Sequence, residues 1–136
     1  MYIDSSVLLR QLLGEGNAIK AFPAADRFVS STLLKVECLR VLDRVRFKHS
    51  IEDKPMVSRR IRLFSMMDSM ELIEVSANIL DFACQPFPTT IRTLDAIHLS
   101  SAILWKRFKK QDITIFTHDI EMGLAARAFG LSVVGC

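Results

Sequence analysis

The chain has 136 residues, of which 50% are hydrophobic and 24% charged, and its formal net charge is +3. This length suits one domain, which we expect to span residues 1–136, with a core large enough to need no disulfide bond. The balance of apolar and charged residues excludes a disordered chain, and no apolar run reaches the ~18 residues of a membrane span.

The N-terminus and the cysteines indicate the cellular compartment. Residues 1–4 carry neither a basic region nor a long apolar stretch, so they are not a signal peptide. Cys38, Cys84 and Cys136 lie far apart, and their spacing indicates neither a disulfide framework nor a zinc site. We therefore expect a soluble cytoplasmic protein with free thiols and no membrane partner.

Basic residues are concentrated in two segments. Between residues 40 and 62 there are eight lysines or arginines against three acidic residues. The eight are Arg40, Arg44, Arg46, Lys48, Lys54, Arg59, Arg60 and Arg62. A second cluster is formed by Lys106, Arg107, Lys109 and Lys110. Such patches can hold phosphates, but they are also typical of solvated helix faces.

Short apolar runs alternate with longer helical patterns from the first residue onwards. A strand over residues 1–4 leads into a helix over residues 5–13, which Gly14 ends. A second strand, over residues 27–30, precedes a helix over residues 31–48 whose apolar positions follow helical spacing. Pro55 suits the first turn of a third helix, which runs to about residue 70.

The second half of the chain repeats the alternation. A strand over residues 71–75 is followed by a short helix over residues 78–84 and a proline-containing loop. Thr93 is expected to be the N-cap of a helix that runs to Phe108. A strand over residues 113–117, a helix over residues 119–129 and a strand over residues 131–134 complete the chain. The pattern predicts an α/β fold with a mainly parallel sheet and helices on both faces.

Four acidic residues are expected at one edge of this sheet. Asp4 ends the first strand, Asp119 follows the fourth, Asp95 lies in the first turn of its helix, and Glu37 lies in the second turn of the helix that follows the second strand. The carboxyl ends of parallel strands and the amino ends of the connecting helices meet at the same edge. The topology therefore brings all four carboxylates together.

Each acid also has a purely structural interpretation. Asp4 and Asp119 could be helix N-caps, and Asp95 could be a first-turn acid that the helix dipole favours. Glu37 is harder to explain in this way, because it interrupts an apolar helical stripe. A carboxylate in such a place needs a partner, a proton or a metal.

Convergence of the four carboxylates indicates a metal centre. Carboxylates without a lysine or arginine between them repel each other, and a divalent cation relieves this repulsion. An all-oxygen site suits Mg²⁺ or Mn²⁺, and such an ion can activate water and stabilise charge on a phosphate. Together with the basic clusters, the acids point to metal-dependent hydrolysis of phosphodiesters.

Several motifs occur together in a characteristic order. They are YIDSSVL (2–8), LKVE (34–37), RTLDAIHLSSA (92–102), FTHD (116–119) and AARAFGL (125–131). In these motifs the chain resembles the PIN-domain ribonucleases, in particular the VapC-type toxins of toxin–antitoxin pairs, over nearly its whole length.

The resemblance implies a five-stranded parallel sheet in the order 3-2-1-4-5. It also implies an endoribonuclease that depends on Mg²⁺ or Mn²⁺, acts on structured RNA, often tRNA or ribosomal RNA, and leaves a 5′-phosphate and a 3′-hydroxyl. A homodimer is implied, as is a cognate antitoxin protein whose C-terminal segment wraps the groove of the active site.

The resemblance also assigns roles to particular residues. The catalytic, metal-binding quartet is Asp4, Glu37, Asp95 and Asp119, with Asp4 and Asp95 as the most direct metal ligands. Ser5 and Thr117 are expected to support them by hydrogen bonds, although Ser5 could instead only cap the first helix.

Other interpretations remain open at the level of sequence. His98 could share a metal with Asp95, but we favour a packed, hydrogen-bonded helix residue. A phosphatase of the haloacid-dehalogenase type needs a second Asp two residues after Asp4, where this chain has Ser6. A response-regulator receiver is disfavoured because no lysine stands at its expected place late in the chain. The alternative function is a catalytically silent PIN-fold module that binds RNA or protein.

Overall fold

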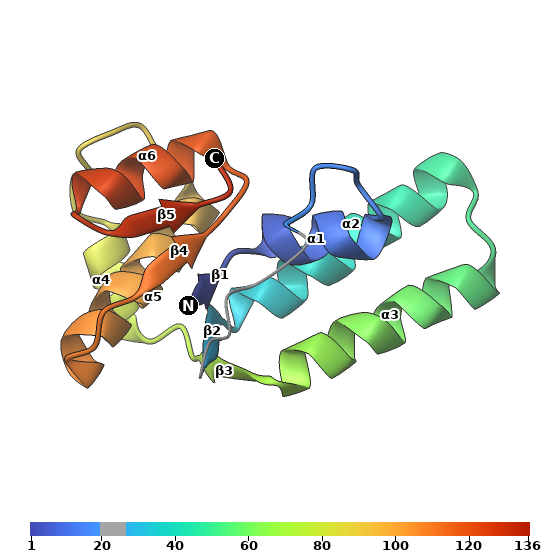
Figure 1. Ribbon diagram of the computed structural model, residues 1–136, viewed down its shortest axis with the longest axis horizontal. Helices are drawn as coiled ribbons and strands as arrows, with labels where there is room; N and C mark the ends of the chain where they lie inside the picture. The colour runs from blue at the N-terminus through green and yellow to red at the C-terminus, as the bar shows by residue number, and fades with distance from the viewer. Residues whose placement is uncertain (20–26) are drawn as a thin grey trace.

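A parallel sheet of five strands organises the computed structural model, which describes residues 1–19 and 27–136 (Figure 1). The strands are β1 (Tyr2–Ile3), β2 (Phe28–Ser31), β3 (Met70–Ile73), β4 (Thr114–Phe116) and β5 (Ser132–Val134). The helices are α1 (Ser5–Leu13), α2 (Leu33–His49), α3 (Asp53–Asp68), α4 (Ala77–Ala83), α5 (Thr93–Lys109) and α6 (Ile120–Ala128). The strand order β3-β2-β1-β4-β5 confirms the predicted topology.

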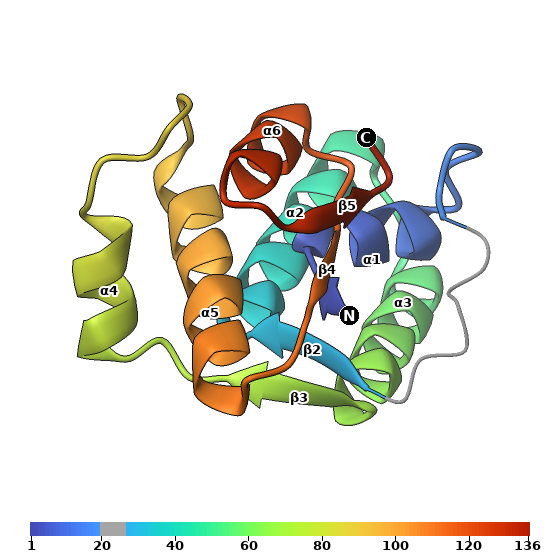
Figure 2. The same cartoon turned by 60° about the vertical axis from the view of Figure 1, so that its left-hand side comes forward.

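Side-chain alternation along the central strands divides the core into two layers. Tyr2 and Ile115 point to one face, where α5 and α6 pack, whereas Ile3 and Phe116 point to the other, where α1, α2 and α3 pack. Figure 2 shows α5 and α6 on one side of the strands and α1, α2 and α3 on the other. Helices therefore cover both faces of the sheet, as the run of apolar strands predicted.

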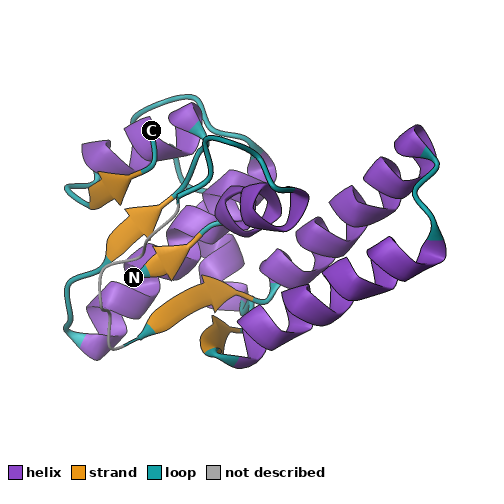
Figure 3. Cartoon of the chain, turned by 45° about the vertical axis from the view of Figure 1, so that its right-hand side comes forward, coloured by secondary structure: helices purple, strands orange, loops and turns teal. Residues whose placement is uncertain are grey.

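The helices α2 and α3 form a long pair that extends beyond the sheet (Figure 3). Most of the first basic segment lies on this pair. Part of its charge is neutralised locally, since Arg40 and Arg60 contact Asp43 at 3.4 Å and 3.6 Å and Arg46 pairs with Asp53. The solvated-face interpretation thus holds for several of these residues.

Most boundaries differ from the sequence prediction by one or two residues, and two of these differences have identifiable reasons. Thr93 is not the N-cap of α5, because Ala96 N–H already donates to Arg92 O at 2.8 Å and makes Arg92 the N-cap. Strand β3 ends at Ile73 and not at residue 75, because β2 offers no residue beyond Ser31 with which to pair. Both differences shift an element by one or two residues and leave the topology unchanged.

Among the helices of residues 1–19 and 27–136, none is both long enough and apolar enough to cross a membrane.

Leu99→Ala tests the core that positions α5. Leu99 is fully buried against the sheet, and we expect its truncation to lower the free energy of unfolding by about 2–5 kcal/mol. Leu124→Ala is the control, because this side chain is 51% exposed on α6 and should cost only about 0.5 kcal/mol. Urea denaturation followed by Trp105 fluorescence measures both, and equal losses would contradict the assigned core.

Candidate active site

Asp4 stands where β1 ends and α1 begins, and only 3% of it is exposed. Its backbone N–H donates to Phe116 O at the end of β4, at 2.9 Å. Its Oδ2 accepts a hydrogen bond from the Thr117 hydroxyl, also at 2.9 Å. Asp4 therefore joins the two central strands at their carboxyl ends, and Thr117 lies beside it as predicted.

Ser6 completes the hydrogen bonds that fix Asp4. Ser6 donates to Asp4 Oδ2 from its hydroxyl, at 2.5 Å, and from its backbone N–H, at 3.3 Å, while its Oγ accepts from the backbone N–H of His118. Asp4 itself caps α1, so the alternative role of Ser5 as a cap is wrong. Ser5 lines the pocket described below but makes no hydrogen bond to Asp4 in the part of the chain that is described.

Glu37 and His98 form a close pair between α2 and α5. His98 Nε2 lies 2.6 Å from Glu37 Oε2, and the imidazole is completely buried. Burial opposes a charged imidazolium, but the hydrogen bond with Glu37 and the negative charge of Asp4 outweigh it, so the pKa of His98 is raised above its ordinary value. The expectation of a packed, hydrogen-bonded histidine is confirmed, with the addition that its partner is Glu37.

Arg92 lies among the carboxylates, which overturns the expectation that no basic residue separates them. Its Nε donates to Asp95 Oδ2 at 2.9 Å, its Nη2 pairs with Asp119 Oδ2, and its Nε is 3.9 Å from Glu121. Asp119 Oδ1 in turn accepts from Met122 N–H and caps α6. Asp119 thus combines the capping role with an ion pair.

All four predicted acids line one pocket of about 320 Å³. Its walls come from the amino ends of three helices and from α2, and they comprise Asp4, Ser5, Ser6, Leu9, Glu37, Arg92, Thr93, Leu94, Asp95 and Asp119. Burial raises the pKa of Asp95 above its ordinary value, Arg92 opposes this, and the negative charges of Asp119 and Asp4 raise it further. The repulsion that the sequence predicted is therefore present and is only partly relieved by Arg92.

Three side chains in or next to the pocket have ligand atoms close enough to share a divalent cation. Ligand atoms of Asp4, Glu37 and His98 all lie within 4.8 Å of one another. Asp4 Oδ2 and Glu37 Oε2 are occupied by hydrogen bonds, but each carboxylate has a second oxygen that makes no hydrogen bond to the described residues. Two carboxylates with a free oxygen each are suitable ligands for a hard cation such as Mg²⁺.

Comparison with known proteins agrees with this geometry. The PIN domain family matches the chain over residues 1–128. The chain belongs to the PIN-domain family. Two curated relatives from Mycobacterium tuberculosis strains, ribonucleases VapC46 and VapC47, are each 28% identical to it over 137 and 138 residues. These alignments cover 98% and 96% of this chain and 95% and 92% of the relatives. The predicted resemblance to VapC-type ribonucleases is confirmed.

Sequence reasoning missed three contributors to this PIN-domain site. Arg92 directly precedes the helix that carries Asp95, and its i, i+3 spacing to Asp95 was a usable signal. Ser6 is two residues after an aspartate at a helix start, the usual place for a capping partner. Tyr2 reaches His98 through the sheet interior, and nothing in the local sequence indicates that contact.

Asp95→Asn tests the electrostatics of the pocket in EDTA. The folded-state pKa of Asp95 is raised above the reference value of 3.8. The preference of the folded state for protonated Asp95 therefore adds to the stability of the fold. This contribution is fully present below pH 3.8 and is lost as the pH rises through the raised folded-state pKa. We expect the variant to melt at a higher temperature than wild type near pH 7, and the difference to shrink as the pH falls towards 4.

Thermal melts across this pH range provide the measurement. Asp81→Asn, on the exposed surface of α4, controls for the loss of one negative charge. A variant at Asp95 that melts below wild type at neutral pH would contradict this account of the pocket.

Proposed function

We propose that this PIN-domain protein is a metal-dependent endoribonuclease that hydrolyses phosphodiester bonds of structured RNA, tRNA or ribosomal RNA, as the toxin of a toxin–antitoxin pair. One observation carries the proposal. Asp4, Glu37, Asp95 and Asp119 come from four separate segments of the chain and line a single pocket at the carboxyl edge of the sheet. The names of the two ribonuclease relatives support the same activity.

Asp4 and Glu37 are the residues best placed to hold Mg²⁺ or Mn²⁺, and Asp95 lines the same pocket. When bound, the cation supplies a Lewis acid that lowers the pKa of water and neutralises charge on the scissile phosphate. Thr117 and Ser6 hold one oxygen of Asp4 and leave the other for the ion. Asp119 holds Arg92 at the rim.

Arg92 is the residue that we assign to the RNA phosphate. Its side chain is 68% exposed although it pairs with two acids, so it can rotate towards solvent at little cost. If Asp95 and Asp119 were engaged with a cation, the guanidinium of Arg92 would be held less tightly and could bind a phosphate by its fork of donors. In this proposal Arg92 pairs with Asp95 and Asp119 when no metal is present, and it binds a phosphate of the RNA backbone when the metal site is filled.

The basic residues outside the pocket supply longer-range attraction for RNA. Lys106, Arg107, Lys109 and Lys110 lie at the carboxyl end of α5, about 20 Å along the helix from Asp95 by its rise per residue. Lys106 and Lys109 contact Asp112 and Glu71, so only part of this charge is available. Exposed cations at this distance raise the rate of encounter with a polyanion more than the specificity of cleavage.

Protein partners are part of the proposal. Large apolar side chains are exposed on α2 and α3, namely Val36, Phe47, Val57, Ile61 and Phe64, at 37–83% exposure. Apolar groups gathered on one helix pair indicate a surface that another protein covers. A cognate antitoxin and a second copy of the chain in a homodimer are the partners that we propose.

The alternative function is a PIN-fold module that binds RNA or protein without cleaving it. It shares the fold and the basic segments but gives no reason for buried acids to line one pocket. Metal-dependent cleavage therefore separates the two functions.

Cleavage of total cellular RNA by the purified chain tests the proposed activity. We expect cutting with Mg²⁺ or Mn²⁺ and none with EDTA. Asp4→Asn and Asp95→Asn should each lower the rate by at least about a hundredfold, because each removes a charge that holds the cation. Mapping the cleaved ends identifies the RNA and should give 5′-phosphates.

Asp81→Asn is the matched control, since it makes the same chemical change on α4, away from the pocket. Cleavage that survives EDTA, or that Asp95→Asn leaves at the wild-type rate in a folded protein, would overturn the proposal. A folded chain that binds the metal and RNA but never cuts would favour the binding module.

Arg92→Gln tests the exchange of Arg92 between carboxylates and phosphate. Removing the competing guanidinium should tighten Mn²⁺ binding by up to about fivefold, the equivalent of one exposed ion pair. The same change should slow RNA cleavage by about tenfold or more, because a charge-assisted contact to the phosphate is lost. Calorimetry and cleavage rates measure the two effects.

Arg27→Gln is the control, because it removes a 54% exposed guanidinium that pairs with Glu71 at the opposite edge of the sheet. Weaker Mn²⁺ binding by the variant at Arg92 would show that Arg92 supports the metal site and does not compete with the ion.

A further inference from the structure

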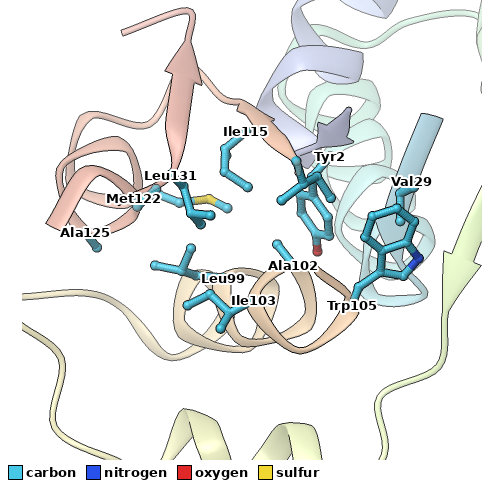
Figure 4. Packing of buried hydrophobic residues seen from close by; sticks show 12 residues of the cluster. Tyr2, Val29, Leu99, Ala102, Ile103, Trp105, Ile115, Met122, Ala125 and Leu131 are labelled. Carbon is cyan, nitrogen blue, oxygen red and sulfur yellow. The ribbon is translucent and has the colours of Figure 1, made fainter. Parts of the chain in front are cut away.

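Three polar side chains form a continuous line from the interior of the sheet to the pocket. The Tyr2 hydroxyl lies 2.8 Å from His98 Nδ1, and His98 Nε2 lies 2.6 Å from Glu37 Oε2. Tyr2 and His98 are both completely buried, and their rings meet edge to face at 79° with centroids 6.0 Å apart. Figure 4 shows the Tyr2 ring leaving β1 with its hydroxyl directed towards α5.

Both ends of the His98 imidazole have a hydrogen-bond partner along this line. Burial and the charge of Asp4 raise the pKa of Tyr2 well above its ordinary value, so Tyr2 is a phenol and keeps its proton. The hydroxyl of Tyr2 is the partner of His98 Nδ1, at 2.8 Å, whether the imidazole is neutral or protonated. A carboxylate oxygen only accepts, so His98 Nε2 is the donor to Glu37 Oε2 at 2.6 Å.

This line constrains a side chain that would otherwise be mobile. Glu37 has several rotatable bonds and lies at the wall of a solvent-filled pocket, with 16% of its side chain exposed. The bond to His98 fixes one carboxylate oxygen and thereby sets the direction of the other. Tyr2 fixes the imidazole in turn, from the far side of the ring.

We propose that Tyr2 and His98 are positioning residues that orient the Glu37 carboxylate for divalent-cation binding. The inference rests on the proposed function, since it concerns the same metal centre. Neither residue touches the cation or the RNA. The line runs through the packed interior between β1 and α5, so the core itself sets the geometry of a ligand.

His98 as a direct ligand is the competing arrangement, because its Nε2 belongs to the same group of ligand atoms within 4.8 Å. The two arrangements differ in what replaces the imidazole. Glutamine keeps an N–H near the position of Nε2 and can still donate to Glu37, but it is a poor substitute for an imidazole ligand. His98→Gln therefore separates an orienting donor from a ligand.

Isothermal titration of Mn²⁺ into the full chain tests the proposal without measuring activity. Tyr2→Phe removes only the hydroxyl, and His98→Leu removes both nitrogens. We expect each to weaken Mn²⁺ binding by about tenfold or more, as loss of an outer hydrogen-bond partner of a ligand does. His98→Gln should bind Mn²⁺ nearly as wild type does.

Two further variants calibrate the titration. Glu37→Gln sets the loss expected when the ligand itself is removed. Ser101→Ala removes another buried hydroxyl from α5, one that donates to Ile97 O, and should leave Mn²⁺ affinity unchanged. Thermal melts in EDTA confirm folding, and if His98→Leu does not fold, Tyr2→Phe and His98→Gln decide the matter.

The outcomes distinguish the proposal from the function on which it rests. Wild-type affinity in folded Tyr2→Phe, beside a clear loss in Glu37→Gln, would overturn the positioning role and leave the metal centre intact. A loss in His98→Gln as large as that in Glu37→Gln would overturn it in favour of direct ligation. A wild-type chain that binds no Mn²⁺ would overturn the proposed function and the positioning role together.

Discussion

The hydrogen bonds to the buried carboxylate of Asp4 are the constraint on which the rest of the site depends. Oδ2 accepts from Thr117, beyond the end of β4, and from Ser6 in α1, while the backbone of Asp4 continues the pairing of β1 with β4. A carboxylate that is 97% buried is tolerated only because these donors replace water. The same bonds bring α1 and the segment leading to α6 to a fixed distance from each other. The acids of the pocket are thus held by strand pairing and not by flexible loops.

Electrostatic interactions and apolar packing both stabilise this pocket, but on different sides of it. Carboxylates gathered at one edge repel each other, and the charges of Asp119 and Asp4 add to the larger effect of burial in raising the pKa of Asp95. Arg92 offsets part of this repulsion from the rim, and the amino ends of α1, α5 and α6 offset more through their free N–H groups. On the buried side, the layer of aromatic and aliphatic side chains around Tyr2 and Leu99 fixes the distance between α5 and the sheet. The pocket is therefore rigid on its buried side and adjustable on its exposed side, where Arg92 lies.

Hydrophobic periodicity predicted the parallel sheet with helices on both faces, and the rule that parallel strands end at one edge predicted the set of acids that line the pocket. The strand order followed only from the resemblance to PIN-domain ribonucleases. The sequence did not predict which contacts the acids make. Arg92 stands three residues before Asp95, an i, i+3 spacing that indicates an ion pair, but its contact with Asp119 depends on the packing of α5 against α6. The contact between Tyr2 and His98 spans 96 residues and depends on the height of α5 above β1, which no local pattern encodes. Boundaries such as the end of β3 depend on the length of a partner strand and share this limitation.

The brevity of β1 has a consequence for how this protein can change over evolution. The strand has two residues, and they point to opposite faces, Tyr2 towards α5 and Ile3 towards α1 and α2. A single inserted or deleted codon between Tyr2 and Asp4 would exchange these faces, because a strand has a period of two residues. Tyr2 would leave His98, and Asp4 would leave Thr117, in the same event. Substitutions can alter this segment one contact at a time, whereas length changes here would dismantle the hydrophobic layer and the carboxylate site together.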